Sequence, residues 1–419
     1  MRMTFSLLLV CLMLAPALGQ DAPAGDASRN VILWINIDGL RGDYVDRGKP
    51  PTLTRLMREG AYSRQLKPVF PSLTFPTHMS LATGTPVSGH GIPGNSFYDA
   101  DDQQIRNYPA DHRFHRGEAI WTTATRQGVR VSVIDWPVSH RQQGPHAAAY
   151  FGQAYDGSLS DEQRLQMAIT PYLVDQHDQP LQLVMGYTSK VDTVGHQHGP
   201  DSPEVLEELK KTDALIDSAL QQITKRFERK MGPNDELYLI ITTDHGMSNV
   251  THQASAERML GPTFSPEVTI VTSGSVAFVH LDKLPADHRD VRRDAMIEQL
   301  KKFEFASTYT RAQAGEKYGL DDPTRVGHLI ISLDKGYTFS RLRAETVIPV
   351  TPRGPLGMHG YPAETNPEMN GFMLVWRLRN KLGGVDLGEV DSLQLHPTVA
   401  RLLHIDPAPA AKADPIHLP

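Results

Sequence analysis

The stretch VILWINIDG at residues 31–39 is a nearly continuous apolar run that ends in an aspartate and a glycine. Similar runs recur as VRVSVIDWP (129–137), LQLVMGYTSKVD (181–192) and LYLIITTDHG (237–246), and helical stretches such as 204–227 lie between them. Strands that are buried on both faces have this composition, and their alternation with helices is typical of parallel sheets. The pattern predicts an α/β fold with a central, mainly parallel sheet flanked by helices.

The order of elements changes in the second half of the chain. Two apolar runs there flank a charged, helix-like stretch at 287–303, which predicts an inserted, smaller α+β lobe over 262–350. The main domain would then comprise 28–261 and 351–405. The Pro/Ala-rich residues 406–419 indicate a loosely held tail.

Composition narrows the classes of function. The chain has 419 residues, of which 40% are hydrophobic and 21% charged, so it is long enough for a large globular domain. Its net charge is −6, and no basic block suited to a nucleic-acid backbone is present in the sequence. General nucleic-acid binding is disfavoured, whereas a small anionic substrate remains compatible.

The N-terminus has the pattern of an export signal over 1–19: an Arg, an apolar run over 5–14 and small residues before Gln20. The apolar run is shorter than the roughly 18–20 residues that span a bilayer, so stable membrane insertion is not expected and an uncleaved anchor is the weaker alternative. We expect a periplasmic or secreted protein. Cys11, the only cysteine, lies in this signal, so any metal must be held by His, Asp, Glu or hydroxyl groups.

Acidic and histidine residues gather where the predicted strands end. Because ligands of open α/β sheets bind at the carboxyl ends of the strands, these side chains should converge on one edge. Asp192 and His196 have the four-residue spacing of one helical face. Taken singly, each position also fits a surface residue or a turn. Together they match a two-metal hydrolytic site: Asp38, Asp192, His196, Asp244, His245 and His359.

A threonine stands between two prolines in FPSLTFPTHMSLATG (70–84). Metal coordination is one way to activate a hydroxyl as a nucleophile, so Thr74 could supply the attacking oxygen. Alternatively, Thr74 caps a helix that begins near Pro76. The two roles are compatible, since a helix N-terminus also favours a phosphoryl anion.

Eight motifs in order now carry a resemblance: NIDG, FPSLTFPTHMSLATG, GHGIPGNSFYD, IWTTATRQGVRVSVIDWPVS, YDGSLSDEQR, VDTVGHQHGPDSP, TTDHGM and GMHGYP. They resemble the nucleotide pyrophosphatase/phosphodiesterase family of the alkaline phosphatase superfamily. The similarity runs from about 30 to 250 and resumes at about 355, while the lobe between is less recognisable. The resemblance implies an alkaline-phosphatase-like fold.

The resemblance also implies two Zn²⁺ ions per chain. One would be held by Asp38, Thr74, Asp244 and His245, and the other by Asp192, His196 and His359. Thr74 would be the nucleophile and would form a covalent threonine intermediate that is then hydrolysed.

Further residues follow from the same resemblance. Asn95 would donate a hydrogen bond to a phosphoryl oxygen, where a neutral donor suits the single charge of a diester. Phe75 and Tyr155 would sandwich the base of a nucleotide substrate, although either ring could be ordinary core. The leading hypothesis is therefore an exported two-zinc phosphodiesterase or nucleotide pyrophosphatase acting on small phosphodiester or nucleotide substrates.

Some features depart from the family pattern. Thr77 stands where Asn is common, the stretch after GMHGYP lacks the usual GPAF, and Lys190 near Asp192 either faces solvent or supplies a positive charge to the substrate. One alternative function on the same scaffold is a phosphate monoesterase. It is disfavoured because related phosphatases with a Thr nucleophile carry a Lys-x-Arg pair for the dianionic phosphate, and 96–191 contain no Lys-x-Arg. Another alternative is a phospholipase C acting on lysophospholipids. An inactive binding protein would show loss of ligands, yet all are present. Nothing in the sequence specifies an oligomeric state.

Overall fold

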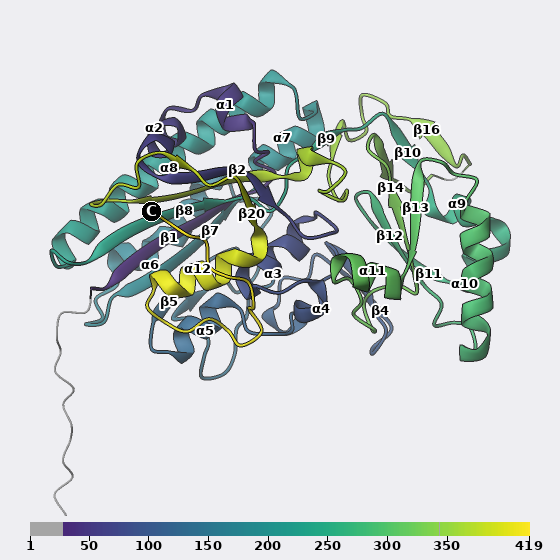
Figure 1. Cartoon of the computed structure of the whole chain (residues 1–419), viewed down its shortest axis with the longest axis horizontal. Helices are drawn as coiled ribbons and strands as arrows, with labels where there is room; N and C mark the ends of the chain where they lie inside the picture. The colour runs from purple at the N-terminus through teal and green to yellow at the C-terminus, as the bar shows by residue number, and fades with distance from the viewer. Residues whose placement is uncertain (1–27, 343) are drawn as a thin grey trace, which may run out of the picture.

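The computed structural model describes residues 28–342 and 344–419, so the expected export signal lies outside the described residues. Its larger part is built on a nine-stranded sheet with the order β19-β2-β18-β8-β1-β7-β5-β6, in which β20 also pairs with β2 (Figure 1). The strands are β1 (Asn30–Ile37), β2 (Ala61–Lys67), β5 (Arg130–Val133), β6 (Tyr150–Phe151), β7 (Leu181–Thr188), β8 (Glu236–Thr242), β18 (Gly371–Arg377), β19 (Val385–Asp386) and β20 (Glu389–Asp391). The central strands β8, β1, β7, β5 and β6 run parallel, and β18 is antiparallel to both of its neighbours. The predicted α/β class with a mainly parallel core is confirmed.

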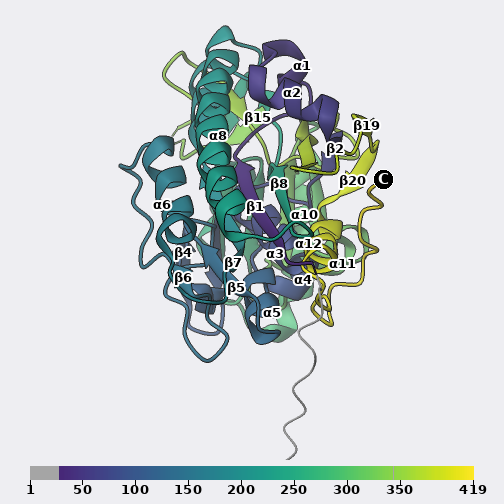
Figure 2. The ribbon, with the colours of Figure 1, turned by 90° about the vertical axis from the view of Figure 1, so that its left-hand side faces the viewer.

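Helices cover both faces of this sheet (Figures 1 and 2). On one face lie α1 (Tyr44–Gly48), α2 (Pro51–Glu59), α6 (Asp161–Val174) and α8 (Pro203–Lys230); on the other lie α3 (Thr74–Thr83), α5 (Ile120–Arg126) and α12 (Leu395–Leu402). Side chains alternate along a strand, so the odd-numbered residues of β1 from Val31 to Ile37 pack against the first group, and Ile32 and Trp34 pack against the second. Both sets are buried, which explains why the run reads as continuously apolar.

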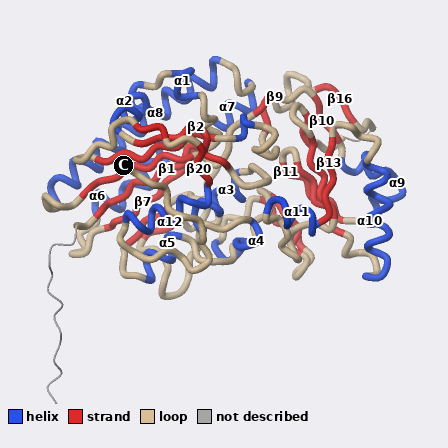
Figure 3. The backbone as a smooth tube through the Cα atoms, viewed as in Figure 1, coloured by secondary structure: helices blue, strands red, loops and turns tan. Residues whose placement is uncertain are grey.

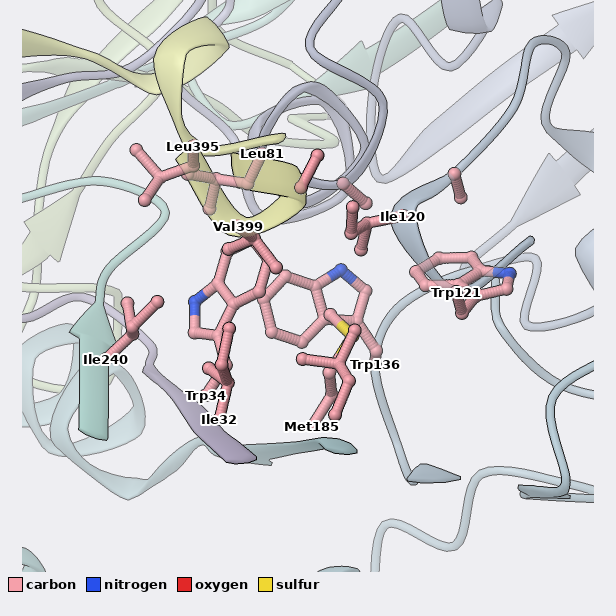
Figure 4. Packing of buried hydrophobic residues seen from close by; sticks show 14 of the residues in the cluster. Ile32, Trp34, Leu81, Ile120, Trp121, Trp136, Met185, Ile240, Leu395 and Val399 are labelled. Atoms are coloured by element: carbon pink, nitrogen blue, oxygen red, sulfur yellow. The ribbon is translucent and has the colours of Figure 1, made fainter. Parts of the chain in front are cut away.

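Two tryptophans lie at the centre of the second cluster, together with apolar residues of α3, α5 and α12 (Figure 4). The rings of Trp34 and Trp136 meet edge to face with centroids 5.0 Å apart. The Nε1–H of Trp136 also donates to the carbonyl of His78 in α3 at 3.3 Å. This packing ties the loop after β5 to the helix that begins at Thr74.

A second sheet forms the smaller lobe, and Figure 3 shows its strands as a group separate from the large sheet. Its antiparallel order is β11-β12-β14-β13, from β11 (Thr269–Ser273), β12 (Val276–His280), β13 (Ala306–Thr310) and β14 (Leu329–Leu333). The helices α9 (Ala256–Phe264) and α10 (Ala286–Leu300) pack on it, and α11 (Arg311–Tyr318) lies nearby. The cluster between sheet and helices includes Ala254 and Met259, which precede the expected boundary at 262. The lobe therefore has the expected α+β composition, and its core draws on residues before that boundary.

Several short elements complete the structure. They are the hairpin β3 (Ser96–Asp99) and β4 (Gln104–Asn107), helices α4 (Val87–His90) and α7 (Lys190–His198), the pair β9 (Ser248–Asn249) and β17 (Gly357–Met358), and the small sheet of β10 (His252–Ala254), β15 (Tyr337–Phe339) and β16 (Val347–Pro349). Single 3₁₀ turns occur at His112–Phe114, Ser265–Glu267, Pro367–Met369 and Ser392–Gln394. Within 28–342 and 344–419, no helix has the length and apolar character needed to cross a membrane.

The C-terminal residues 406–419 pack against α12, where the sequence indicates a loosely held tail. The backbone N–H of Ile416 donates to Thr398 Oγ1 at 2.8 Å, and that of Ala408 to His396 Nε2 at 2.9 Å. Ile416 is buried in the large cluster. Composition alone suggested mobility because it does not register these long-range contacts.

Candidate active site

The carboxyl ends of three parallel strands carry most of the site. The register pairs Ile37 of β1 with Thr188 of β7, and Asn36 with Thr242 of β8, so the three strands end at the same level. Gly39 follows β1 with a φ of +68°, and a Cβ there would lie 3.0 Å from the Cα of Asp192. This glycine lets the chain after β1 approach α7 closely.

All six predicted acidic and histidine ligands come together at this edge. His196 Nε2 lies 3.3 Å and His359 Nε2 3.7 Å from Asp192 Oδ1. His245 Nε2 lies 3.4 Å from Asp38 Oδ1 and 3.2 Å from Asp244 Oδ2. The rings of His245 and His359 stack with centroids 3.5 Å apart.

The three histidines are held in one orientation. Nδ1 of His196 lies 2.7 Å from the carbonyl of Gly357, Nδ1 of His245 lies 2.8 Å from that of Gly246, and Nδ1 of His359 lies 3.0 Å from that of Ser72. A carbonyl only accepts, so each Nδ1 carries a proton and each Nε2 faces the cluster, where it can offer its lone pair to a bound ion. Such backbone contacts are typical of metal-ligating histidines.

The carboxylates have the complementary property. Asp38 Oδ1, Asp192 Oδ1 and Asp244 Oδ2 are buried and have no hydrogen-bond partner among the described residues. The possible ligand atoms form two groups, and within each group they all lie within 4.8 Å of one another. One group is Asp192, His196 and His359, and the other is Asp38, Asp192 and His245. Unpaired carboxylate oxygens beside imidazole nitrogens are a donor set that fits divalent metal ions.

The pKa values of these side chains reflect their crowding. Burial, together with the charges of Asp244 and Asp192, raises the pKa of Asp38 well above its usual range. The pKa of His196 rises to about 9 because the adjacent Asp192 outweighs burial, whereas burial lowers the pKa of His359 to about 3. Positive charge brought to this edge would relieve the repulsion among the carboxylates.

Thr74 is the first residue of α3, and its N-cap neighbour is Leu73. Its Oγ1 points to the cluster, 3.3 Å from His245 Nε2 and 3.5 Å from Asn95 Nδ2. The side chain of Asn95 is fixed, because its Oδ1 accepts the backbone N–H of Phe75 at 2.9 Å. The structure therefore brings Thr74 and Asn95 together beside the ligands, and the capping role left open by the sequence is not the one that Thr74 Oγ1 plays.

A cavity of about 600 Å³ opens over this cluster. Main-domain loops and the lobe both line it, the latter through Thr272, Ser273 and Gly274. Phe75 and Tyr155 contribute to the wall, and Lys190 is the only lysine or arginine among the described lining residues.

Tyr108, Tyr187 and Asp135 are among the lining residues that the sequence analysis did not single out. Tyr108, which follows the β3–β4 hairpin, meets Phe75 edge to face with centroids 5.7 Å apart. The hydroxyl of Tyr187 donates to Asp38 Oδ2, which leaves Oδ1 for a metal. Asp135 follows β5 and lines the cavity. Only Asp135 carried the strand-end signal that identified Asp38 and Asp244; the two tyrosines were brought in by tertiary contacts.

The fold and the site define an α/β protein with a cluster of metal-binding character below a substrate-sized cavity. The family model for type I phosphodiesterase/nucleotide pyrophosphatase matches residues 32–362, which is more than half of the chain. The chain belongs to this family.

Several curated relatives are similar over part of the chain. An uncharacterized pyrophosphatase/phosphodiesterase of Schizosaccharomyces pombe is 32% identical over 228 residues, 52% of this chain and 45% of that protein. Ectonucleotide pyrophosphatase/phosphodiesterase family member 1 of Homo sapiens is 30% identical over 54% of this chain and 24% of its own length. The chain thus spans less than half the length of these relatives. Bis(5'-adenosyl)-triphosphatase enpp4 of Xenopus laevis is 29% identical over 82% of this chain and 71% of its own length.

Solved structures share the fold. Murine ectonucleotide pyrophosphatase/phosphodiesterase 5 superposes with a TM-score of 0.76 at 22% identity, covering 91% of this chain and 96% of that chain. The same values hold for its inactive form in complex with AMP.

Proposed function

We propose that this chain is an exported two-zinc phosphodiesterase and nucleotide pyrophosphatase that works through a covalent threonine intermediate. The observation that carries the proposal is the matched donor set, in which imidazole lone pairs fixed by backbone carbonyls face carboxylate oxygens that have no hydrogen-bond partner among the described residues. Family membership supports the reaction class. Export rests on the N-terminal sequence pattern alone.

Asp38, Asp244 and His245 with Thr74 would hold one ion, and Asp192, His196 and His359 the other. Bound there, the ions would lower the pKa of the threonine hydroxyl and offset the charge of the phosphoryl oxygens. Asp192 belongs to both groups of ligand atoms.

The chain's own residues would carry the chemistry in two displacements. Thr74 Oγ1 attacks phosphorus, the Oγ–P bond forms and the bond to the leaving oxygen breaks. Water then attacks phosphorus, the Oγ–P bond breaks and the hydroxyl is restored. Asn95 Nδ2, which lies 3.5 Å from Thr74 Oγ1, would donate to a non-bridging oxygen of the phosphoryl group as negative charge develops there.

A nucleotide is the substrate class that suits the cavity. Its volume of about 600 Å³ lies within the usual range for small-molecule sites. Phe75, Tyr108 and Tyr155 offer aromatic surface to a base, and such stacking is worth roughly 1–3 kcal/mol per base. Relatives named as bis(5'-adenosyl)-triphosphatases support a nucleotide as the substrate class.

One observation favours a phosphate monoesterase as the second candidate. Lys190 lines the cavity, and a cation there would help to bind a dianionic monoester. Asn95 as a neutral donor favours the diester.

The test compares kcat/KM of the zinc-loaded protein on p-nitrophenyl thymidine 5′-monophosphate, bis-p-nitrophenyl phosphate and p-nitrophenyl phosphate. We expect the nucleotide diester to be preferred by more than tenfold. Preference for the monoester would make the protein a phosphatase, and release of choline phosphate from a lysophospholipid in preference to all three would make it a phospholipase C. Negligible turnover of all four by a fully metallated sample would reject catalysis.

A further inference from the structure

Tyr155 is a loop residue with 45% of its surface exposed, yet its ring is supported from one side. The guanidinium carbon of Arg164, from α6, lies 4.3 Å from the ring centroid. Arg164 itself is only 1% exposed. A buried guanidinium stacked on a tyrosine is an expensive arrangement unless its charge and donors are matched.

Arg164 is anchored at two further points. One end of the fork donates to the carboxylate of Asp135, and the other donates to the backbone carbonyl of Asp156, the residue next to Tyr155. His140 Nε2 lies 3.2 Å from the second carboxylate oxygen of Asp135. Arg164 thereby holds both the ring of Tyr155 and the backbone beside it.

The anchor is unusual in its backbone as well. Asp135 has a φ of 56°, a conformation that costs a non-glycine residue free energy and persists only where surrounding contacts maintain it. Trp136, the next residue, is packed against Trp34 in the core of the large sheet. The core of the domain is thus connected through Asp135 and Arg164 to a side chain in the cavity wall.

We infer that Arg164 is a positioning residue for nucleotide binding: it occupies one face of the Tyr155 ring and presents the opposite face to the base. This inference rests on the proposed function and deepens it. It assigns part of the preference for substrates that carry a base to a residue outside the cavity lining. An alternative is that Arg164 only neutralises the buried Asp135 and stabilises the fold.

The two roles are separated by a ratio that is insensitive to general damage. We define it as kcat/KM for p-nitrophenyl thymidine 5′-monophosphate divided by kcat/KM for bis-p-nitrophenyl phosphate, which has no base. Arg164→Lys retains the charge but loses the planar fork, and is expected to lower the ratio about fivefold. The matched control is Arg130→Lys, which alters another arginine paired with an aspartate, Asp175, at the start of β5 and therefore at the end of that strand away from Asp135. Its ratio should stay at the wild-type value.

A double-mutant cycle supplies the decisive comparison. If Arg164 acts through Tyr155, Arg164→Lys should change the ratio by less than twofold in a Tyr155→Ala background. Asp135→Asn, which weakens the anchor while retaining its shape, should lower the ratio in the same direction and is available if Arg164→Lys does not fold. An unchanged ratio in the folded variants, or an equal effect with and without Tyr155, would overturn the inference. A wild-type ratio near one would instead reject the nucleotide preference, so the two failures are distinguishable.

Discussion

The ligand cluster, formed by the six acidic and histidine residues at the strand ends, differs in construction from the outer cavity formed by Phe75, Tyr108, Tyr155 and Lys190 with the lobe residues 272–274. Five of its residues follow β1, β7 and β8, strands whose side chains are almost all buried on both faces, and His359 follows β17. The outer cavity is made by a hairpin end, a loop and the first residue of a helix.

This difference indicates that the ligand cluster carries the chemical step and that the outer cavity sets substrate preference. Rigid strand ends fix the groups that must meet at one phosphorus atom, whereas loops set which substituent that phosphorus carries. Changes in the cluster should therefore abolish turnover of every substrate, and changes in the outer cavity should alter the ranking of substrates.

The largest effect is expected for Thr74→Ala. Loss of the attacking oxygen should lower kcat by about 10³-fold or more on diester and monoester substrates alike, while the metal content stays near the wild-type value. Steady-state kinetics with metal analysis by mass spectrometry would measure both. Thr77→Ala is the matched control, since Thr77 is a buried threonine of the same helix. Retention of most activity by Thr74→Ala would disprove the covalent mechanism.

Metal removal should come next, because it leaves three buried carboxylates facing one another. A free ion at about 1,000 times its Kd raises the free energy of unfolding of a one-site protein by about 4 kcal/mol. Chelation removes this contribution, and we expect Tm to fall by roughly 5–10 °C. Calorimetry with EDTA, followed by zinc addition, would measure this. Asp192→Asn, which alters the ligand shared by both groups, should show a smaller change. A Tm that is insensitive to chelation would argue against a metal cluster.

A smaller and more selective effect is expected for Tyr108→Ala. Loss of its stacking surface beside Phe75 should lower kcat/KM for p-nitrophenyl thymidine 5′-monophosphate by about 5- to 100-fold, with little change for bis-p-nitrophenyl phosphate. Ile105→Ala, an exposed residue on the same hairpin, serves as the control. Equal losses on both substrates would mean that Tyr108 supports the chemical step itself, and that the outer cavity does more than set substrate preference.

The smallest effect is expected for Lys190→Gln. If the protein is a diesterase, kcat/KM for the nucleotide diester should change by only about twofold, because a partly exposed cation screened by water contributes little. Lys210→Gln on α8 provides a comparison remote from the cavity. A loss of tenfold or more on p-nitrophenyl phosphate alone would assign Lys190 to monoester binding.

Sequence patterns anticipated the parts whose information is local. The nearly continuous apolar runs indicate strands that are buried on both faces. The register of β1 with β7 and β8 then brings Asp38 to the same edge of the sheet as Asp192 and Asp244. The four-residue spacing of Asp192 and His196 acquired its meaning from α7, which begins two residues before Asp192. Export, the zinc ions and the roles of individual site residues remain predictions and proposals.

The sequence by itself determined the sheet, its polar edge and the kinds of ligand gathered there, because strand periodicity and short motifs act over a few residues. Only the tertiary structure decided that Tyr108 lies against Phe75, that Tyr187 holds Asp38 and that Arg164 supports Tyr155. It also decided that residues 406–419 pack on α12. Each of these contacts joins positions that are far apart in the chain or lie on separate elements, so the local sequence does not specify the partner. Burying a charge or a hydrogen-bond donor costs free energy unless the folded chain supplies a matching group.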